Sequence, residues 1–197
     1  EVDLLLVNPG NRVEQFAALS PLATVAPPLG IALLAAYVRE RGFSVAIFDA
    51  EAHGIGAAEE AVKEIAARYR PRVVGLTAFT TKKTDAGAIL REVKRQLPGA
   101  LTLIGGHHPS ALPAQTLREE AADFVIKGEG FIPVALLLDE VCSGSKFYAG
   151  IPGLWNLNVD GTVRNGGQAP GIKDLDILPL PAWDLLPMER YRAHHWQ

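Results

Sequence analysis

The chain has 197 residues, of which 48% are hydrophobic and 21% are charged, so it can form one domain with a sizeable core. A formal net charge of -3 and the lack of a basic cluster argue against nucleic acid or an anionic membrane as the main partner. The single cysteine, Cys142, excludes an intrachain disulfide and favours a reducing, cytoplasmic location, and no apolar run reaches the roughly 18 residues of a membrane span.

Five short apolar runs predict strands, over residues 2–7, 44–49, 72–78, 100–105 and 123–127. The runs are nearly continuous rather than alternating, which is typical of parallel strands buried on both faces. Amphipathic segments between them predict helices over residues 27–42, 56–71, 82–99, 113–120 and 130–144. The alternation predicts a flavodoxin-like (Rossmann-type) α/β domain over residues 1–145, with a five-stranded parallel sheet in the order 2-1-3-4-5.

The character of the chain changes after about residue 145. Asp160 and Gly161 lie between two short alternating runs, which predicts a β-hairpin. The proline-rich stretch that follows cannot form one long helix. We therefore expect residues 146–197 to form a hairpin and a linker that leads to another domain. Because the chain lacks an initiator methionine and ends abruptly, we also expect a piece of a longer protein.

Small and polar residues gather where the predicted strands end. In this fold ligands bind outside the carboxyl ends of the strands, near the switch point between the first and third strands. Glycines at strand ends can also be plain turn residues, but these loops converge on one place. The long connection over residues 8–28 adds to this edge, because long loops are commonly functional. The candidate binding residues are Asn8, Pro9, Leu29, Gly30, Thr77, Phe79, Thr80, Gly105, Gly106, His107, Gly128, Glu129 and Gly130.

Four segments, "VVGLTAFT", "TLIGGHHPSALP", "FVIKGEG" and "LPLPAWDLLP", together carry a resemblance to a known family. They resemble the N-terminal cobalamin-binding domain of radical S-adenosylmethionine enzymes, which include anaerobic magnesium-protoporphyrin monomethyl ester cyclase-like proteins and cobalamin-dependent methyltransferases. The resemblance covers residues 2–191. It implies cobalamin as the cofactor, and glycines that let the dimethylbenzimidazole tail pass between the sheet and the helices.

The wider cobalamin-domain family carries three signatures, of which this chain keeps two. The Ser-x-Leu signature becomes Thr77-Ala78-Phe79, and the Gly-Gly signature is intact at Gly105 and Gly106. The Asp-x-His-x-x-Gly signature is broken: aligned on Gly30, its Asp falls on Val25 and its cobalt-binding His on Pro27. The resemblance therefore implies cobalamin with its base displaced and no imidazole from this loop.

The histidines carry separate expectations. His53, in "EAHGIG", imitates the broken signature but follows the second strand, so we interpret it as a histidine of a loop or helix start. His107 and His108 follow the fourth strand, where His107 could contact the corrin side chains. His194 and His195 belong to the end of the chain, where residues are mostly disordered unless docked. Glu129 lies at the start of the next predicted helix, where its negative charge interacts favourably with the helix dipole. The resemblance also places it against the nucleotide ribose.

One cysteine cannot supply the Cys-x-x-x-Cys-x-x-Cys motif that holds a four-iron cluster. This chain alone is therefore not expected to be catalytic. The resemblance implies a C-terminal radical S-adenosylmethionine domain in the same polypeptide, with a 4Fe-4S cluster and S-adenosylmethionine, and leaves methyl transfer and oxidative cyclisation open.

Two alternatives remain: a domain that binds another ligand such as a flavin or nucleotide, and a non-catalytic interaction module. The first is weakened because no Gly-x-Gly-x-x-Gly follows the first strand. An interaction module of the receiver type needs clustered acidic residues at the ends of the first and third strands. This chain has Asn8-Pro9 and Thr77-Ala78 at those ends, which argues against phosphotransfer.

Overall fold

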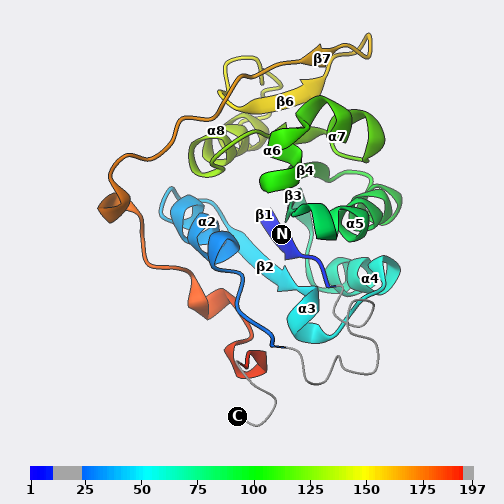
Figure 1. Ribbon diagram of the computed structural model, residues 1–197, viewed down its shortest axis with the longest axis vertical. Coiled ribbons are helices and arrows are strands. Elements are labelled where there is room, and N and C mark those ends of the chain that lie inside the picture. Colours follow the sequence, from blue (N-terminus) through cyan, green and yellow to red (C-terminus); the bar gives the residue numbers. More distant parts are fainter. Residues whose placement is uncertain (11–23, 193–197) are drawn as a thin grey trace.

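A seven-stranded sheet forms the centre of the molecule (Figure 1). The computed structural model describes residues 1–10 and 24–192. The strands are β1 (Val2–Asn8), β2 (Val45–Asp49), β3 (Pro71–Thr77), β4 (Leu101–Gly105), β5 (Phe124–Ile126), β6 (Leu154–Leu157) and β7 (Val163–Arg164). Their order is β2-β1-β3-β4-β5-β6-β7, and the first five strands pair in parallel. The predicted order 2-1-3-4-5 and the α/β class are therefore confirmed.

The number of strands corrects the prediction of five. The hairpin is present, but it extends the sheet: β6 pairs antiparallel with β5, and β7 pairs antiparallel with β6. This pairing covers the row of backbone groups that β5 would otherwise leave open at the edge of the sheet. Gly161 has a φ of 79° in the turn, and the backbone N–H of Asn158 donates to the carbonyl oxygen of Thr162 at 2.8 Å.

Helices cover both faces of the sheet, with α2 and α8 on one side and α4, α5 and α7 on the other (Figure 1). Two short helices, α3 and α6, were not among the predicted helices; α3 begins directly after β2, and α6 begins one residue after β4. Within the described part of the chain, no helix is both long and apolar enough to cross a membrane. The helices are α2 (Leu29–Arg39), α3 (Ala50–His53), α4 (Ala58–Arg68), α5 (Lys83–Gln96), α6 (His107–Ala111), α7 (Pro113–Glu119) and α8 (Phe131–Cys142).

The apolar runs are continuous because each strand serves two cores. In β1, Leu4 and Leu6 belong to the core under α2 and α8, whereas Leu5 and Val7 belong to the core under α4 and α5. Side chains alternate between the two faces of a strand, so a strand buried on both faces needs an apolar residue at every position.

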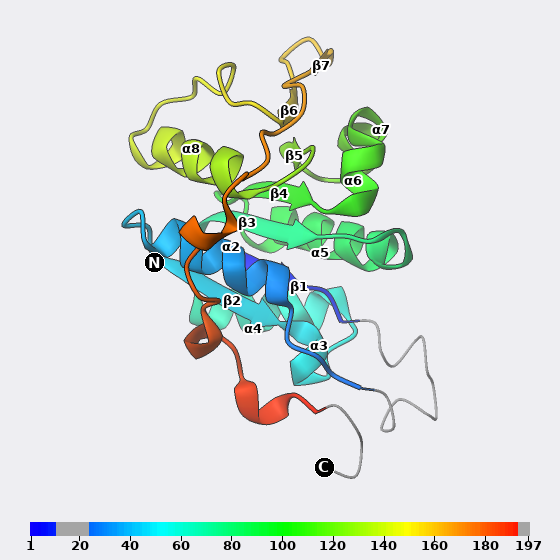
Figure 2. The same ribbon diagram turned by 60° about the vertical axis from the view of Figure 1, so that its left-hand side comes forward.

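Residues 175–192, which we call the strap, pass alongside α2 (Figure 2). The strap contains three short 3-10 turns, Leu175–Ile177, Trp183–Leu185 and Met188–Arg190. The backbone N–H of Ala182 donates to the carbonyl oxygen of Ala32 at 3.0 Å. Arg39 donates through both terminal nitrogens to Asp184, at 2.6 and 3.1 Å. The predicted extended linker is thus packed on the domain over this stretch.

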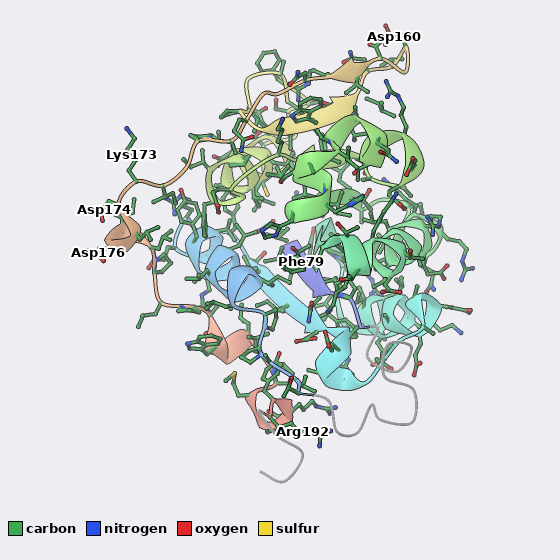
Figure 3. All side chains as sticks on the ribbon, viewed as in Figure 1. Phe79, Asp160, Lys173, Asp174, Asp176 and Arg192 are labelled. Carbon is green, nitrogen blue, oxygen red and sulfur yellow. The ribbon has the colours of Figure 1, made fainter. Side chains whose placement is uncertain are left out.

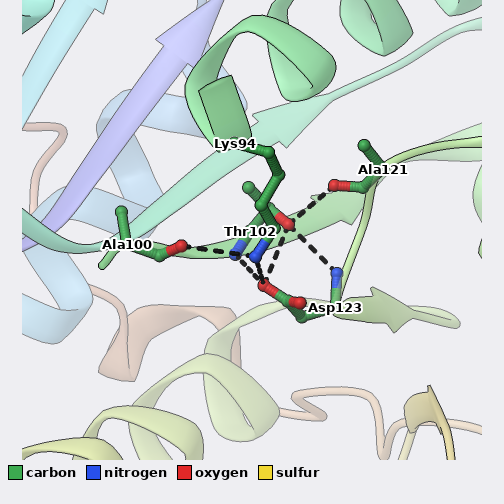
Figure 4. A network of polar contacts seen from close by, with 5 residues as sticks. All are labelled: Lys94, Ala100, Thr102, Ala121 and Asp123. Atoms are coloured by element: carbon green, nitrogen blue, oxygen red, sulfur yellow. Dashed lines mark hydrogen bonds and ion pairs between the residues drawn. The ribbon is translucent and has the colours of Figure 1, made fainter. Parts of the chain in front are cut away.

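A polar network ties the start of β4 to the start of β5 (Figure 4). The Thr102 side chain is fully buried. Its hydroxyl donates to the carbonyl oxygen of Ala121 at 2.8 Å and accepts from the backbone N–H of Asp123 at 3.0 Å. The Asp123 carboxylate accepts from the backbone N–H of Thr102 at 2.7 Å and pairs with Lys94. These contacts fix the strand pairing that brings the ends of β4 and β5 side by side.

We expect Thr102→Val to lower the free energy of unfolding by about 0.5–1.5 kcal/mol, because it removes the hydroxyl that donates to the Ala121 carbonyl oxygen. The Asp123 N–H keeps its second acceptor, the backbone carbonyl oxygen of Thr102 at 3.0 Å. Urea denaturation measures this change. Thr84→Val, at an exposed position of α5, is the matched control and should have little effect. Equal stability of the two variants would contradict a structural role for the network.

Candidate functional site

One face of the sheet loses its bulky side chains toward the strand ends. On the face under α2 and α8, Val73 of β3 is followed by Gly75 and Thr77, and Leu103 of β4 is followed by Gly105. Because side chains alternate along a strand, these positions share one face. The small residues leave an open volume between the sheet and the helices.

This volume is a cavity of about 740 Å³ at the carboxyl ends of the parallel strands. It lies where ligands bind in doubly wound α/β folds. Eleven of the thirteen candidate residues line it: Asn8, Leu29, Gly30, Thr77, Phe79, Gly105, Gly106, His107, Gly128, Glu129 and Gly130. Pro9 and Thr80 are not among the lining residues, although the Pro9 carbonyl oxygen accepts from Lys82 Nζ at 3.3 Å. The contact of these residues with a cofactor remains a prediction.

Two adjacent glycines, Gly105 at the end of β4 and Gly106 directly after it, have different roles. A Cβ added to Gly105 would meet only Ile126, at an ordinary 3.7 Å, so the missing side chain leaves space. A Cβ on Gly106 would lie 2.8 Å from the carbonyl oxygen of Ala78, and Gly106 has a φ of 103°. Gly106 is thus required by the backbone itself. Gly30, at the start of α2, resembles Gly105, because a Cβ there would have no atom within 4 Å.

Sequence reasoning missed Gly75, which lies in the interior of β3 and lines the cavity. A Cβ on Gly75 would come within 3.1 Å of the Leu6 side chain. Glycine inside a strand signals close approach of another group, so the signal was available in the sequence.

The loop after β5 supplies the remaining glycines of the cavity. Gly128 has a φ of 98°, which L-residues with a side chain rarely adopt, so the backbone conformation favours glycine here too. Glu129 lines the cavity directly before the N-cap residue of α8, Gly130.

Two aromatic rings stack beside the cavity. The rings of Phe79 and His107 lie 4.9 Å apart with an interplanar angle of 17°. Both residues line the cavity and both are exposed, with Phe79 at 52%. Figure 3 labels Phe79 near the middle of the view. The stack offers a flat, partly apolar surface to a ligand.

A charged pair, also missed from the sequence, lies on the cavity wall. Lys82 Nζ and Glu51 Oε2 are 2.5 Å apart, and both side chains are about one-fifth exposed. Both residues line the cavity. The two come from different connections, after β3 and β2, so only the fold brings them together.

Asp49 connects Asn8 of the cavity wall with the strap. Its carboxylate accepts from Asn8 Nδ2 at 2.9 Å, from the backbone N–H of Ala52 at 3.1 Å and from the Tyr191 hydroxyl at 2.7 Å. Asp49 is only 1% exposed. Burial, and then the hydrogen bond to Asp49, raises the pKa of Tyr191 well above its usual range, so the hydroxyl keeps its proton and donates.

The positions of the broken signature carry no metal ligand. Val25 is buried and forms an isolated antiparallel bridge with Arg192. His53 ends α3, stacks on Phe48 and places Nδ1 2.7 Å from the Asp49 carbonyl oxygen, which agrees with a local structural role. His107 is the only described histidine that lines the cavity. Across residues 1–10 and 24–192, no group of three His, Cys, Asp or Glu side chains could hold a metal ion.

The remaining candidate segments are a buried histidine and two stretches that lie partly or wholly outside the described residues. His108 is buried in α6 and does not line the cavity. Most of the long connection over residues 8–28, and both His194 and His195, lie outside the described residues.

The two adjacent glycines can be told apart by stability alone. We expect Gly105→Ala to keep or slightly raise the free energy of unfolding, because its Cβ fits and glycine is unfavourable within a strand. Gly106→Ala should lower it by about 1–3 kcal/mol, because alanine is strained at this φ. Thermal and urea denaturation of both variants measures the difference. The reverse order would contradict the assignment of open space to Gly105.

Comparison with known proteins identifies the family of the chain. The model of the B12 binding domain family matches residues 17–138, more than half of the chain. An uncharacterized methyltransferase of Pyrococcus horikoshii is 35% identical over 173 residues, which cover 87% of this chain and 37% of that protein. The anaerobic magnesium-protoporphyrin IX monomethyl ester cyclase of Rubrivivax gelatinosus is 32% identical over 170 residues, covering 84% of this chain and 30% of that enzyme.

Solved structures share the fold. The cobalamin-dependent S-adenosylmethionine radical enzyme OxsB, with aqua-cobalamin and S-adenosylmethionine bound, superposes with a TM-score of 0.74 at 19% identity, over 94% of this chain and 25% of OxsB. The radical S-adenosylmethionine methyltransferase TsrM of Kitasatospora setae gives 0.70 at 23% identity, over 87% of this chain and 31% of TsrM. The match to the family model and the identity with these sequence relatives show that the chain belongs to the B12-binding domain family.

Proposed function

We propose that cobalamin binds in the cavity between the glycine-bearing face of the sheet and helices α2 and α8, with its nucleotide tail in the space beside Gly105. The observation that carries this proposal is the open space at Gly30 and Gly105: an added Cβ atom would meet no atom within 4 Å at Gly30 and only Ile126 at Gly105. The residues that would hold the cofactor are the candidate residues that line the cavity. Neither a flavin or nucleotide ligand nor a pure interaction module is favoured by the family match.

The residues present fit a flat, largely apolar ligand with polar groups at its edge. The wall combines apolar side chains such as Leu6, Leu34 and Phe131 with a few polar groups, among them Asn8 and Thr77. In sites of this composition, burial of apolar ligand surface supplies most of the affinity, and a few hydrogen bonds fix the orientation of the ligand. When bound, cobalamin supplies the cobalt chemistry, and the chain supplies binding and orientation.

The chain spans 30% to 37% of the length of the two sequence relatives described above. We therefore propose that it is the N-terminal module of a radical S-adenosylmethionine enzyme whose C-terminal domain holds a 4Fe-4S cluster and S-adenosylmethionine. The reaction of the whole protein would be methyl transfer or oxidative cyclisation. Exposed apolar side chains on the strap favour the presence of a neighbouring domain, since such patches commonly mark interfaces between proteins or domains. They are Leu175, Ile177, Leu180 and Met188.

Two finer expectations belong to the same proposal. The cofactor-binding domain would end near residue 145, with residues 146–197 as the hairpin and the connection to the catalytic domain. The single cysteine supports a cytoplasmic location.

Replacing Gly30 by leucine should fill the cavity without harming the fold, because its Cβ position is open and leucine favours helices more than glycine does. We expect Gly30→Leu to weaken hydroxocobalamin binding by at least about tenfold, measured by absorbance titration. Gly56→Leu is the matched control: its Cβ position is also open, but it does not line the cavity. Unchanged affinity in Gly30→Leu would place the cofactor elsewhere.

The broken signature generates a spectroscopic prediction. Because Pro27 replaces the cobalt-binding His, we expect the electron paramagnetic resonance spectrum of bound cob(II)alamin to lack the nitrogen superhyperfine pattern of a coordinated imidazole. A nitrogen pattern from a protein histidine or from the cofactor's own base would show that the lower face is ligated after all.

A further inference from the structure

The strap reaches the cavity wall at two neighbouring residues, Tyr191 and Arg192. The Tyr191 hydroxyl donates to Asp49 Oδ2, and Asp49 Oδ1 accepts from Asn8 Nδ2. The backbone N–H of Arg192 donates to the Val25 carbonyl oxygen at 3.0 Å, and that of Val25 donates to the Arg192 carbonyl oxygen at 3.1 Å. In Figure 3, Arg192 lies at the lower end of the strap.

Both contacts lead to residues that line the cavity. Asn8 lines it at the end of β1. Val25 is followed by Ala26, and then by Pro28 and Leu29, which also line it. The end of the strap is therefore attached to the strand end and to the segment that enters α2, two separate parts of one wall.

The contact with Asp49 also decides which way the Asn8 amide faces. A carboxylate only accepts, so the amide nitrogen must face Asp49. The Asn8 amide oxygen has no hydrogen-bond donor among the residues that the structure describes. Asn8 is only 8% exposed, and a buried acceptor on a cavity wall is satisfied at low cost only by a donor on the ligand or by water. The corrin ring of cobalamin carries primary amide side chains, which are such donors.

We propose that Tyr191 is a positioning residue of the cavity. Through Asp49 it holds the Asn8 side chain so that the amide oxygen can accept a hydrogen bond from an amide group of the cofactor. Docking of the strap is thereby coupled to occupancy of the cavity. The identity of the donor rests on the proposed binding of cobalamin. The coupling is reciprocal, because a ligand that binds better when the strap is docked also favours the docked strap.

Tyr191→Phe tests this directly, because it keeps the ring and removes only the hydroxyl. We expect about fivefold to tenfold weaker binding of hydroxocobalamin by absorbance titration, as for loss of the one neutral hydrogen bond between the Asn8 amide oxygen and the cofactor. Asp184→Asn is the matched control. It weakens the strap's other side-chain anchor, on Arg39 at the far end of α2, and should change the affinity less than twofold.

A double-mutant cycle separates positioning from loosening of the strap. If Tyr191 acts through Asn8, the double variant Asn8→Ala with Tyr191→Phe should bind no more weakly than Asn8→Ala alone. Additive losses would overturn the proposal, and so would an equal loss in Asp184→Asn and Tyr191→Phe. If the wild-type protein retained no cobalamin, the proposed function would fall and this inference with it, whereas full affinity in Tyr191→Phe would overturn this inference alone.

Hydrogen exchange of the wild-type protein gives a second test that needs no variant. Adding hydroxocobalamin should slow exchange at the backbone amides of Val25 and Arg192, which pair the strap with the cavity wall. The amide of Asn158, in the hairpin turn, should exchange at an unchanged rate. No change at Val25 and Arg192 in a protein that binds the cofactor would contradict the coupling.

Discussion

The structure depends on the alternation of side chains along buried parallel strands. Each strand must be apolar on both faces to build the two cores, so any open space has to come from positions where the side chain is missing. Gly105 is such a position, near the carboxyl end of β4 on the face under α2 and α8. Gly75 lines the same cavity, but there the missing side chain lets Leu6 approach closely. A cavity arises there while the rest of the sheet stays closely packed.

The cavity needs rigid surroundings, because a gap in a well-packed protein tends to close. Several features keep it open. The network around Thr102 holds β4 and β5 in register, and Gly106 packs against the backbone of Ala78. Asp49 joins the ends of β1 and β2 to α3 and to the strap. The binding site is thus built mainly from backbone and from buried hydrogen bonds rather than from a set of reactive side chains.

The sequence was sufficient for the parts of the site that depend on local pattern. Apolar runs located the parallel strands, and the residues at their ends, such as Thr77 and Gly105, follow directly from the topology. Contacts between distant segments could not be predicted. Tyr191 lies 142 positions from Asp49, and nothing in its local sequence indicates a buried partner. The same holds for the pairing of β6 with β5, because a hairpin signal does not say which sheet edge the hairpin joins.

The central claim is that the space beside Gly105 receives the nucleotide tail of cobalamin. Cobinamide has the corrin ring and the cobalt but lacks that tail, so comparing its affinity with that of cobalamin on the same protein isolates the contribution of the space. We predict that cobinamide binds more weakly by at least about a hundredfold, since the buried area of a flat aromatic ring is lost. Equal affinity for the two corrinoids would show that the tail lies outside the protein and would contradict the account.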